Sequence, residues 1–183
     1  MLLSARSPLV VLAPSLVAQG IRLRAELPED DPFLIALYRT TRESELDMLP
    51  DWSEEQKQAF VLFQFNAQRH HYRTVLENVA FDVIERHGEP IGRLYSQELR
   101  SQLHIVDIAL SPEVRGQGLG GAILESLGFH AARAGKALGI FVESYNPARH
   151  LYDRLGFQSI GEQHIYVEME RPVEVALARG EVA

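Results

Sequence analysis

The stretch Leu103–Gly121, with the sequence LHIVDIALSPEVRGQGLGG, decides the fold of this chain. Leu103–Leu110 is almost entirely apolar and predicts a strand, whereas Arg115–Gly121 is basic and rich in glycine. Glycine lets a backbone approach a ligand closely, and the free N–H groups and the dipole at a helix start favour negative charge. The stretch therefore predicts a strand, an anion-binding loop and a helix start, an arrangement suited to a phosphate-bearing cofactor.

Length and composition predict one ordinary globular domain. The chain has 183 residues, of which 46% are hydrophobic and 23% charged, and its formal net charge is −7. An acidic chain argues against nonspecific nucleic-acid binding, which needs a basic surface, and leaves room for a cationic substrate. The sequence has no cysteine, which excludes disulfides, thiolate metal sites and cysteine nucleophiles.

The start of the chain is apolar but is broken by Pro8 and Pro14. It has no clean cleavage site, so we expect an N-terminal extension over residues 1–20, loosely ordered or packed at an edge, rather than a signal peptide. No apolar run in the sequence reaches the roughly 20 residues that a membrane span needs. We therefore expect a cytoplasmic protein with no membrane partner.

Capping and alternation predict the elements before residue 103. Ile21–Ala25 alternates as a strand does, and Asp31 with Pro32 marks a helix start. Three apolar segments then predict a meander of antiparallel strands. These segments are Phe81–Glu85, Pro90–Tyr95 and Leu103–Leu110.

A second early helix is predicted by the capping box Ser53–Gln56. One face of this helix carries Phe60, Phe63, Ala67 and His71. The polar residues on its other faces are Gln64, Gln68 and Arg69. We expect these polar side chains to form a solvated face or, alternatively, the rim of an acceptor cleft.

The elements after the glycine-rich loop alternate between helix and strand. Apolar residues at spacings of three and four predict a helix over residues 119–134, which Gly135 ends. Leu138–Val142 predicts a strand, and Asn146 followed by Pro147 predicts the start of another helix. The last predictions are a hairpin of Gln158–Ile160 with Ile165–Met169, and a tail over residues 172–183 that is a short helix or disordered.

Gly116, Gly118 and Gly121 also fit the dinucleotide-binding pattern, with Glu143 placed as a ribose ligand. The linker between strand and glycines is long for that fold. The motif also comes late in the chain and follows an antiparallel meander rather than alternating strands and helices. We therefore regard a dinucleotide-binding protein as the weaker alternative.

Two motifs together identify a family resemblance. Val114–Gly120 resembles the R/Q-x-x-G-x-G/A signature of the GNAT N-acetyltransferase superfamily, with Arg115, Gly118 and Gly120 at the named positions. Asn146–Phe157 is similar to the later motif of the same superfamily. The resemblance covers residues 21–171 and implies a single α/β (α+β) domain, leaving a C-terminal tail at residues 172–183. The implied sheet is mixed and mostly antiparallel, with about six to seven strands flanked by helices and a splayed parallel pair at the cofactor site.

The resemblance implies acetyl-CoA as co-substrate and places it in the splay. The backbones of Ile108, Ala109 and Leu110 would pair with the pantetheine arm, and the Ile108 N–H would polarise the thioester carbonyl. The N–H groups that would hold the pyrophosphate belong to Arg115, Gly116, Gln117, Gly118, Leu119, Gly120 and Gly121. Asn146 is a ligand of the cofactor arm by resemblance and a plain helix cap by sequence, and both roles stay open.

Catalytic candidates follow from the same resemblance and from amine chemistry. Tyr152 matches the usual general acid, with a core aromatic as the alternative. An amine is protonated at neutral pH and must lose a proton, for which the candidates are His104, Asp107, Glu98 and Glu143. His104 and Asp107 point to opposite faces of a regular strand unless a bulge changes the parity. We favour Asp107, although an ion pair with an arginine explains that residue equally well.

The resulting hypothesis is an N-acetyltransferase in which a primary amine attacks acetyl-CoA directly within a ternary complex. No cysteine is present to carry an acyl-enzyme. The alternative from another class is a CoA-binding sensor or interaction module without turnover. The expected partner is a small-molecule or peptide amine, with a homodimer possible. No metal is expected, because the adjacent His70 and His71 cannot both face one ion from a helix.

Overall fold

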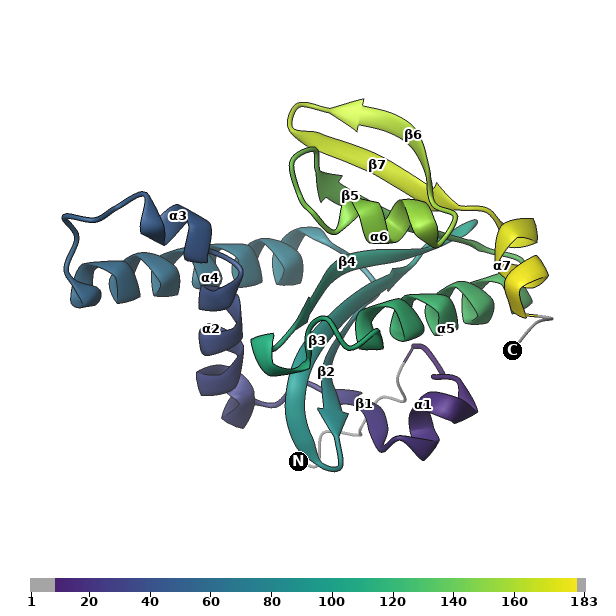
Figure 1. Ribbon diagram of the computed structural model, residues 1–183, viewed down its shortest axis with the longest axis horizontal. Helices are drawn as coiled ribbons and strands as arrows, with labels where there is room; N and C mark the ends of the chain where they lie inside the picture. The colour runs from purple at the N-terminus through teal and green to yellow at the C-terminus, as the bar shows by residue number, and fades with distance from the viewer. Residues whose placement is uncertain (1–8, 181–183) are drawn as a thin grey trace.

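A seven-stranded mixed sheet runs through the protein in the order β1-β2-β3-β4-β5-β7-β6, as Figure 1 shows. The computed structural model describes residues 9–180. The strands are β1 Ile21–Ala25, β2 Val79–Arg86, β3 Glu89–Glu98, β4 Gln102–Leu110, β5 Ala137–Glu143, β6 Gln158–Gln163 and β7 Tyr166–Arg171. The helices are α1 Pro14–Ala18, α2 Asp31–Thr40, α3 Glu43–Asp47, α4 Glu54–Val75, α5 Leu119–Arg133, α6 Arg149–Arg154 and α7 Val173–Gly180, with short 3-10 turns at Pro28–Asp30 and Pro112–Val114.

The sheet consists of two antiparallel parts joined by one parallel contact. Strands β2 to β4 form the predicted antiparallel meander, β1 pairs antiparallel with β2 at its edge, and β7 lies between β5 and β6. Strands β4 and β5 run parallel, and they pair only over Gln102–Ile105 and Ala137–Ile140. The predicted fold class is confirmed, including the mixed and mostly antiparallel sheet and the splayed parallel pair.

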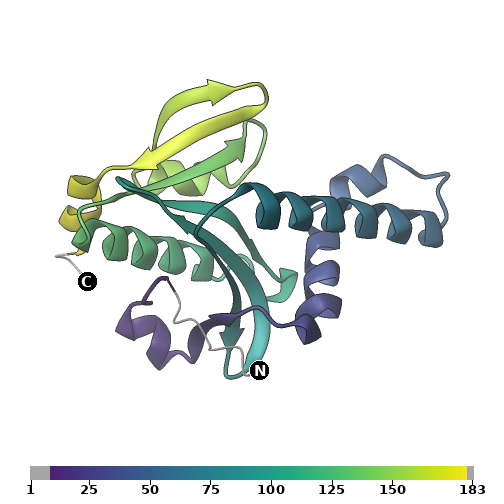
Figure 2. The ribbon, with the colours of Figure 1, turned by 180° about the vertical axis from the view of Figure 1, so that it is seen from behind.

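Helix α5 supplies the centre of the larger core. Its buried residues Ile123, Leu124 and Leu127 recur at helical spacing and pack with β4, β5 and α6 in one apolar cluster. The predicted stop is confirmed, because Gly135 follows α5 with a φ of 69°. Helices α5 and α6 lie on one face of the sheet, and α4 crosses the other face, as Figures 1 and 2 show together.

Helix α4 turns a different face inward from the one its apolar pattern predicts. Val61 and Phe65 are buried in a second cluster with α2, whereas Phe63 is 72% exposed. The polar side chains Gln68 and Arg69 face the protein, where they bind arginine and carboxylate partners. The prediction from apolar spacing was wrong because α4 packs Val61 and Phe65 on α2 and turns Gln68 and Arg69 toward charged partners on β3, on α2 and after β1.

Before β1, the described residues 9–20 pack on the larger core. Val10, Leu12 and Leu16 are buried in the cluster of α5, and the Ala13 N–H donates to Ser126 Oγ at 2.7 Å. Of the two expected states, loosely ordered or packed, residues 9–20 are packed, because their apolar side chains cover part of α5. Residues 1–8 and 181–183 lie outside the described residues.

The C-terminal segment from residue 173 to 180 forms helix α7, one of the two states the sequence left open. Helix α7 packs beside α5 (Figure 1). Among residues 9–180, no helix combines the length and the apolar character needed to cross a membrane.

Candidate active site

The splay between β4 and β5 opens just above their parallel contact. The paired region ends at Ile105 and Ile140, and both strands continue apart from each other. The Ser111 N–H donates to the carbonyl of Ile91 in β3 at 2.8 Å. Because successive residues of a strand alternate in direction, the backbone groups of Ile108 and Leu110 point away from β3 and into the gap. The Ile108 N–H therefore faces the gap, whereas the backbone groups of Ala109, expected to pair with the cofactor arm as well, point toward β3 instead.

The glycine-rich loop meets the open end of the gap and leads into α5. Gly116 and Gly118 have φ values of 72° and 81°, a left-handed backbone that favours glycine. None of the N–H groups from Gly116 to Gly121 donates a hydrogen bond to an acceptor within residues 9–180, and the first amide to do so is that of Ala122, to the Gly118 carbonyl at 3.0 Å. Successive free donors at a helix start form a ready anion site.

The polar side chains of the loop are used within the protein. Arg115 Nε donates to the Leu110 carbonyl at 2.7 Å, and its Nη2 donates to Thr40 Oγ1 at 2.6 Å. The Arg115 N–H itself donates to the Pro112 carbonyl, so it lies outside the row of free amides. Gln117 Nε2 donates to the Glu113 carbonyl at 2.7 Å. The donors left for an anion are thus backbone N–H groups, and Arg115 ties the loop to β4 and α2.

Asn146 closes the turn before α6. Its Oδ1 accepts the Ala148 N–H at 2.9 Å, which is a local turn bond, while its Nδ2 donates to no acceptor in the described part of the chain. Helix α6 begins at Arg149, not at the predicted Pro147, because this turn takes up Pro147 and Ala148 first. The capping role is therefore present, and the amide nitrogen is left for another partner.

Tyr152 lies on α6 and is 5% exposed. Its ring packs edge-on against Phe157 with centroids 5.4 Å apart. Burial, together with the negative charge of Asp107, raises the pKa of Tyr152 to about 12. Because of this raised pKa, the Tyr152 hydroxyl is protonated at neutral pH. It makes no side-chain hydrogen bond within residues 9–180.

A β-bulge brings His104 and Asp107 to the same face. Tyr95 pairs with Asp107 and Ser96 with Ile105, so Val106 is the extra residue of β4. The core-facing residues therefore change from Leu103 and Ile105 to Ile108 and Leu110, three positions rather than two beyond Ile105. His104 and Asp107 both lie on the opposite face, the one that α4 crosses. From sequence alone, the presence of this bulge was an open question, and so was the face of β4 on which each of the two residues lies.

Asp107 is held by a buried arginine. Arg93 Nε donates to Oδ1 at 2.9 Å and Nη2 to Oδ2 at 2.8 Å, and the Arg93 side chain is only 3% exposed. The same Nη2 also donates to Gln68 Oε1 of α4 at 3.1 Å. Both carboxylate oxygens of Asp107 are thus engaged by one guanidinium in a charge-assisted, bidentate pair.

His104 stands at the base of the splay. Its Nδ1 lies 3.1 Å from Gln102 Oε1, and its ring lies 5.2 Å from that of Phe141. Burial lowers the pKa of His104, which favours the neutral imidazole. The carboxylate of Glu98 pairs with Lys136 at 2.7 Å, at the far end of β3, and is not part of this group. Glu143 is half-buried at the end of β5.

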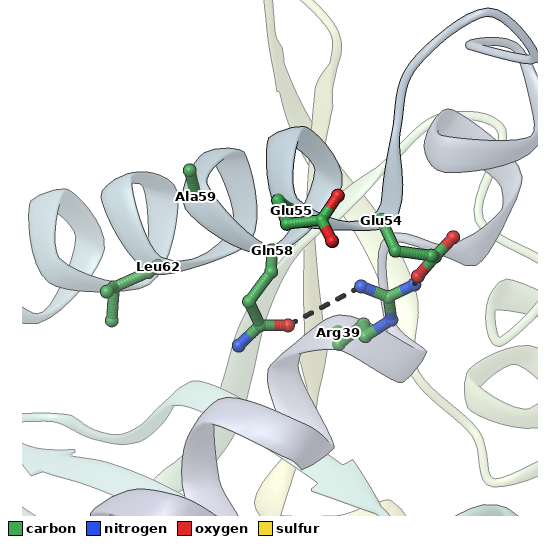
Figure 3. Close-up of a pocket in the computed structure, with 6 residues that line it drawn as sticks. All are labelled: Arg39, Glu54, Glu55, Gln58, Ala59 and Leu62. Atoms are coloured by element: carbon green, nitrogen blue, oxygen red, sulfur yellow. Dashed lines mark hydrogen bonds and ion pairs between the residues drawn. The ribbon is translucent and has the colours of Figure 1, made fainter.

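An open hollow of about 510 Å³ lies elsewhere, between α2 and the first half of α4 (Figure 3). Arg39 binds Glu54 at 2.8 Å and Gln58 at 3.5 Å across it. It contains none of the candidate site residues, and two of its charged residues, Arg39 and Glu54, are paired with each other. No group of three or more metal-ligating side chains occurs among the described residues.

Comparison with known proteins agrees with this geometry. Residues 69–159 match the family model described as an acetyltransferase (GNAT) domain, and no curated protein matches the chain. The PaiA N-acetyltransferase from Thermoplasma acidophilum, in complex with coenzyme A, is 17% identical, with 83% of this chain and 98% of that chain covered and a TM-score of 0.61.

Two further solved structures share the fold. The ribosomal-protein-S18-alanine N-acetyltransferase from Escherichia coli is 20% identical, covering 84% of this chain and 94% of its own, with a TM-score of 0.53. RimL, a ribosomal L7/L12 alpha-N-protein acetyltransferase, is 20% identical, covering 94% of this chain and 99% of its own, with a TM-score of 0.57. Residues 69–159 of the chain thus match the GNAT acetyltransferase family, and the chain has the fold of the acetyltransferases it resembles.

Proposed function

We propose that the protein is an acetyl-CoA-dependent N-acetyltransferase that acts on a primary amine by direct attack. One observation carries the proposal: the free amides of Gly116–Gly121 lie at the open end of the splayed strands β4 and β5. A diphosphate fits the amides, and an extended arm fits the unpaired edge of β4. The relative solved with coenzyme A supports the same ligand.

The groups that face the gap supply the hydrogen bonds that this ligand would need. Acetyl-CoA supplies an activated acetyl thioester when it is bound. The N–H of Ile108 faces the gap and is placed to donate to the thioester oxygen as negative charge develops there. Gly116–Gly121 bind the diphosphate, and Asn146 Nδ2 is free to donate to the arm.

Tyr152 is the proposed donor to the departing sulfur. A thiol has a pKa of about 8.5, well below that of this buried phenol, so complete proton transfer to sulfur costs energy. A hydrogen bond from the hydroxyl stabilises the thiolate without complete transfer. Protonated Tyr152 can therefore assist the leaving sulfur by proton transfer or by a hydrogen bond.

The acceptor amine approaches from the face that carries His104 and Asp107. Asp107, in its ion pair with Arg93, lies on this face, and His104, whose pKa is lowered by burial, is the group able to take a proton. Two relatives with the same fold are named as ribosomal-protein N-acetyltransferases, which supports an amine on a peptide as much as one on a small molecule. A cytoplasmic location and a homodimer remain part of the proposal.

Calorimetry with two glycine variants tests the cofactor site. Gly118 and Gly135 flank α5, both have positive φ, and an added methyl group on either meets no atom within 4 Å. Alanine strains both positions by a similar amount, about 1 kcal/mol. We expect Gly118→Ala to weaken acetyl-CoA binding at least ten-fold, whereas Gly135→Ala leaves it unchanged and NAD does not bind the wild type. Equal losses in both variants, or no heat with acetyl-CoA, would refute the site.

The Arg93–Asp107 pair also favours a second function, a CoA-binding module without turnover. Both carboxylate oxygens of Asp107 accept hydrogen bonds from Arg93, so the site has fewer side chains left for proton transfer. Release of free thiol from acetyl-CoA over a panel of small and peptide amines separates the two functions. Thiol release that depends on the amine supports the transferase, and binding with no release across the panel supports the module.

A further inference from the structure

The side chain of Gln102 crosses the neighbouring strand β5 at Gly139. An ideal Cβ built on Gly139 would lie 2.2 Å from Gln102 Cδ, closer than any real contact. Gly139 does not have a positive φ, so its backbone conformation is open to other residues. Glycine weakens the interior of a strand, and here it supplies room for a crossing side chain.

The crossing connects three strands through two hydrogen bonds. Gln102 Nε2 donates to Glu170 Oε2 on β7 at 2.9 Å, and Gln102 Oε1 lies 3.1 Å from His104 Nδ1. Register supports the arrangement, because Gly139 pairs with His104 on one side and with Glu170 on the other. The three polar side chains thus lie in one line across the sheet.

The chemistry of the two ends fixes the direction of both hydrogen bonds. A carboxylate only accepts hydrogen bonds, so the amide nitrogen of Gln102 must face Glu170 and its oxygen must face His104. An amide oxygen also only accepts, so His104 Nδ1 must carry the proton. Neutral His104 therefore keeps an unprotonated Nε2 with a free lone pair.

We propose that Glu170 and Gln102, with room provided by Gly139, are positioning residues that hold His104 in its Nδ1–H tautomer and so make Nε2 the proton acceptor for the incoming amine. The tautomer stands on the hydrogen bonds alone, and its use in the reaction rests on the proposed acetyl transfer. Glu170 acts only through Gln102, as the orienting member of the chain.

Proton balance fits a single acceptor at this position. The acceptor ammonium gives one proton to His104 Nε2, and the nitrogen lone pair then forms the C–N bond. The C–S bond breaks with its electron pair on sulfur, and the second proton of the nitrogen passes to that sulfur with the help of Tyr152. His104 returns its proton to water, so one amide, one thiol and one proton are produced.

The charged groups on the same sheet face as His104 are few. Asp107 is paired with Arg93, and Glu170 is bound by Gln102. Glu168 lies two residues before Glu170 on the same face of β7 and forms no ion pair or hydrogen bond to a side chain within residues 9–180. Glu168 therefore offers a matched control, with the same charge on the same strand and no contact to Gln102.

Nitrogen-15 NMR of the histidine rings in the full chain tests the tautomer directly. We expect wild-type His104 to carry its proton on Nδ1 at neutral pH, and Glu168→Gln to leave this signature unchanged. In Glu170→Gln the anchoring carboxylate is lost, the Gln102 amide is free to flip, and a substantial Nε2–H population is expected. Wild-type His104 protonated on Nε2, or a Glu170→Gln spectrum identical to wild type, would overturn the relay.

Turnover of the same variants tests the use of the tautomer. We expect kcat to fall about ten-fold in Glu170→Gln, a part of the usual effect of a general base, with KM for acetyl-CoA unchanged and Glu168→Gln near wild type. A shifted tautomer with undiminished kcat would refute His104 as proton acceptor and leave acetyl transfer standing. Absence of turnover in the wild type with every amine would refute the proposed function, while the NMR result would still decide the tautomer.

Discussion

Tyr152 has a structural part and a proposed catalytic part, because its ring packs in the core against Phe157 and its hydroxyl is the proposed donor to the departing sulfur. The pKa of about 12 keeps the proton on oxygen across the physiological range. Tyr152→Phe keeps the ring contact with Phe157 and removes only the hydroxyl. We expect kcat to fall about 100-fold, typical of losing a general acid, with acetyl-CoA affinity and melting temperature near wild type. Steady-state kinetics beside calorimetry would measure both, and an undiminished kcat would make Tyr152 a core residue only.

Single residues also show where sequence reasoning stops. Asp107 stands out in an apolar strand, but its partner Arg93 lies in a separate strand with no motif around it. A charged residue inside the apolar strand 90–95 was the available signal, and it indicated a buried partner without identifying which one. Glu170 was equally hidden, because it meets Gln102 across 68 residues of sequence.

At the scale of elements, the link between β1 and the start of α2 depends on ionisation. Arg24 binds both oxygens of Asp30 at 2.6 and 2.7 Å, and the Asp30 side chain is 8% exposed. The hydrogen bonds from Arg24 lower the pKa of Asp30 below its ordinary 3.8. The unfolded chain therefore binds a proton first as pH falls, so this stabilisation is present above about pH 4 and is lost as pH falls through the lowered pKa.

Urea unfolding between pH 2.5 and 6 measures this contribution. We expect Asp30→Asn to be about 1 to 3 kcal/mol less stable than wild type at pH 6, since a buried charged hydrogen bond is lost. The difference should shrink toward the acid end, where the wild-type carboxyl also becomes neutral. A difference that stays constant across the range would mean that the charge of Asp30 does not contribute.

Elements that are set by local signals were predictable, and elements set by distant partners were less so. The meander, α5 and its glycine stop follow from alternation, helical spacing and one conformational requirement, and each is found. The inward face of α4 was not predictable, because Gln68 and Arg69 point inward only to meet Arg93, Glu26 and Asp31. The bulge at Val106 likewise arises from register with β3, which no local pattern encodes.

For the whole molecule, the glycine-rich loop was the part of the proposed site whose backbone geometry the sequence predicted best. Its function depends on backbone geometry, and glycine at Gly116 and Gly118 signals that geometry directly. The proton-transfer side was predicted least, because it combines side chains from β3, β4, β5 and β7. The sequence named His104 and Asp107, and only the folded sheet distinguishes the paired carboxylate from the neutral imidazole.

The splay between β4 and β5 has a consequence for solvent exchange. Along the upper part of β4 the amide of Ala109 donates toward β3, while those of Ile108 and Leu110 point into the gap. In the free protein, deuterium should therefore enter this short segment in an alternating pattern, fast at two positions and slow between them. Saturation with coenzyme A would erase the alternation, because the arm laid along the strand would shield both fast positions at once.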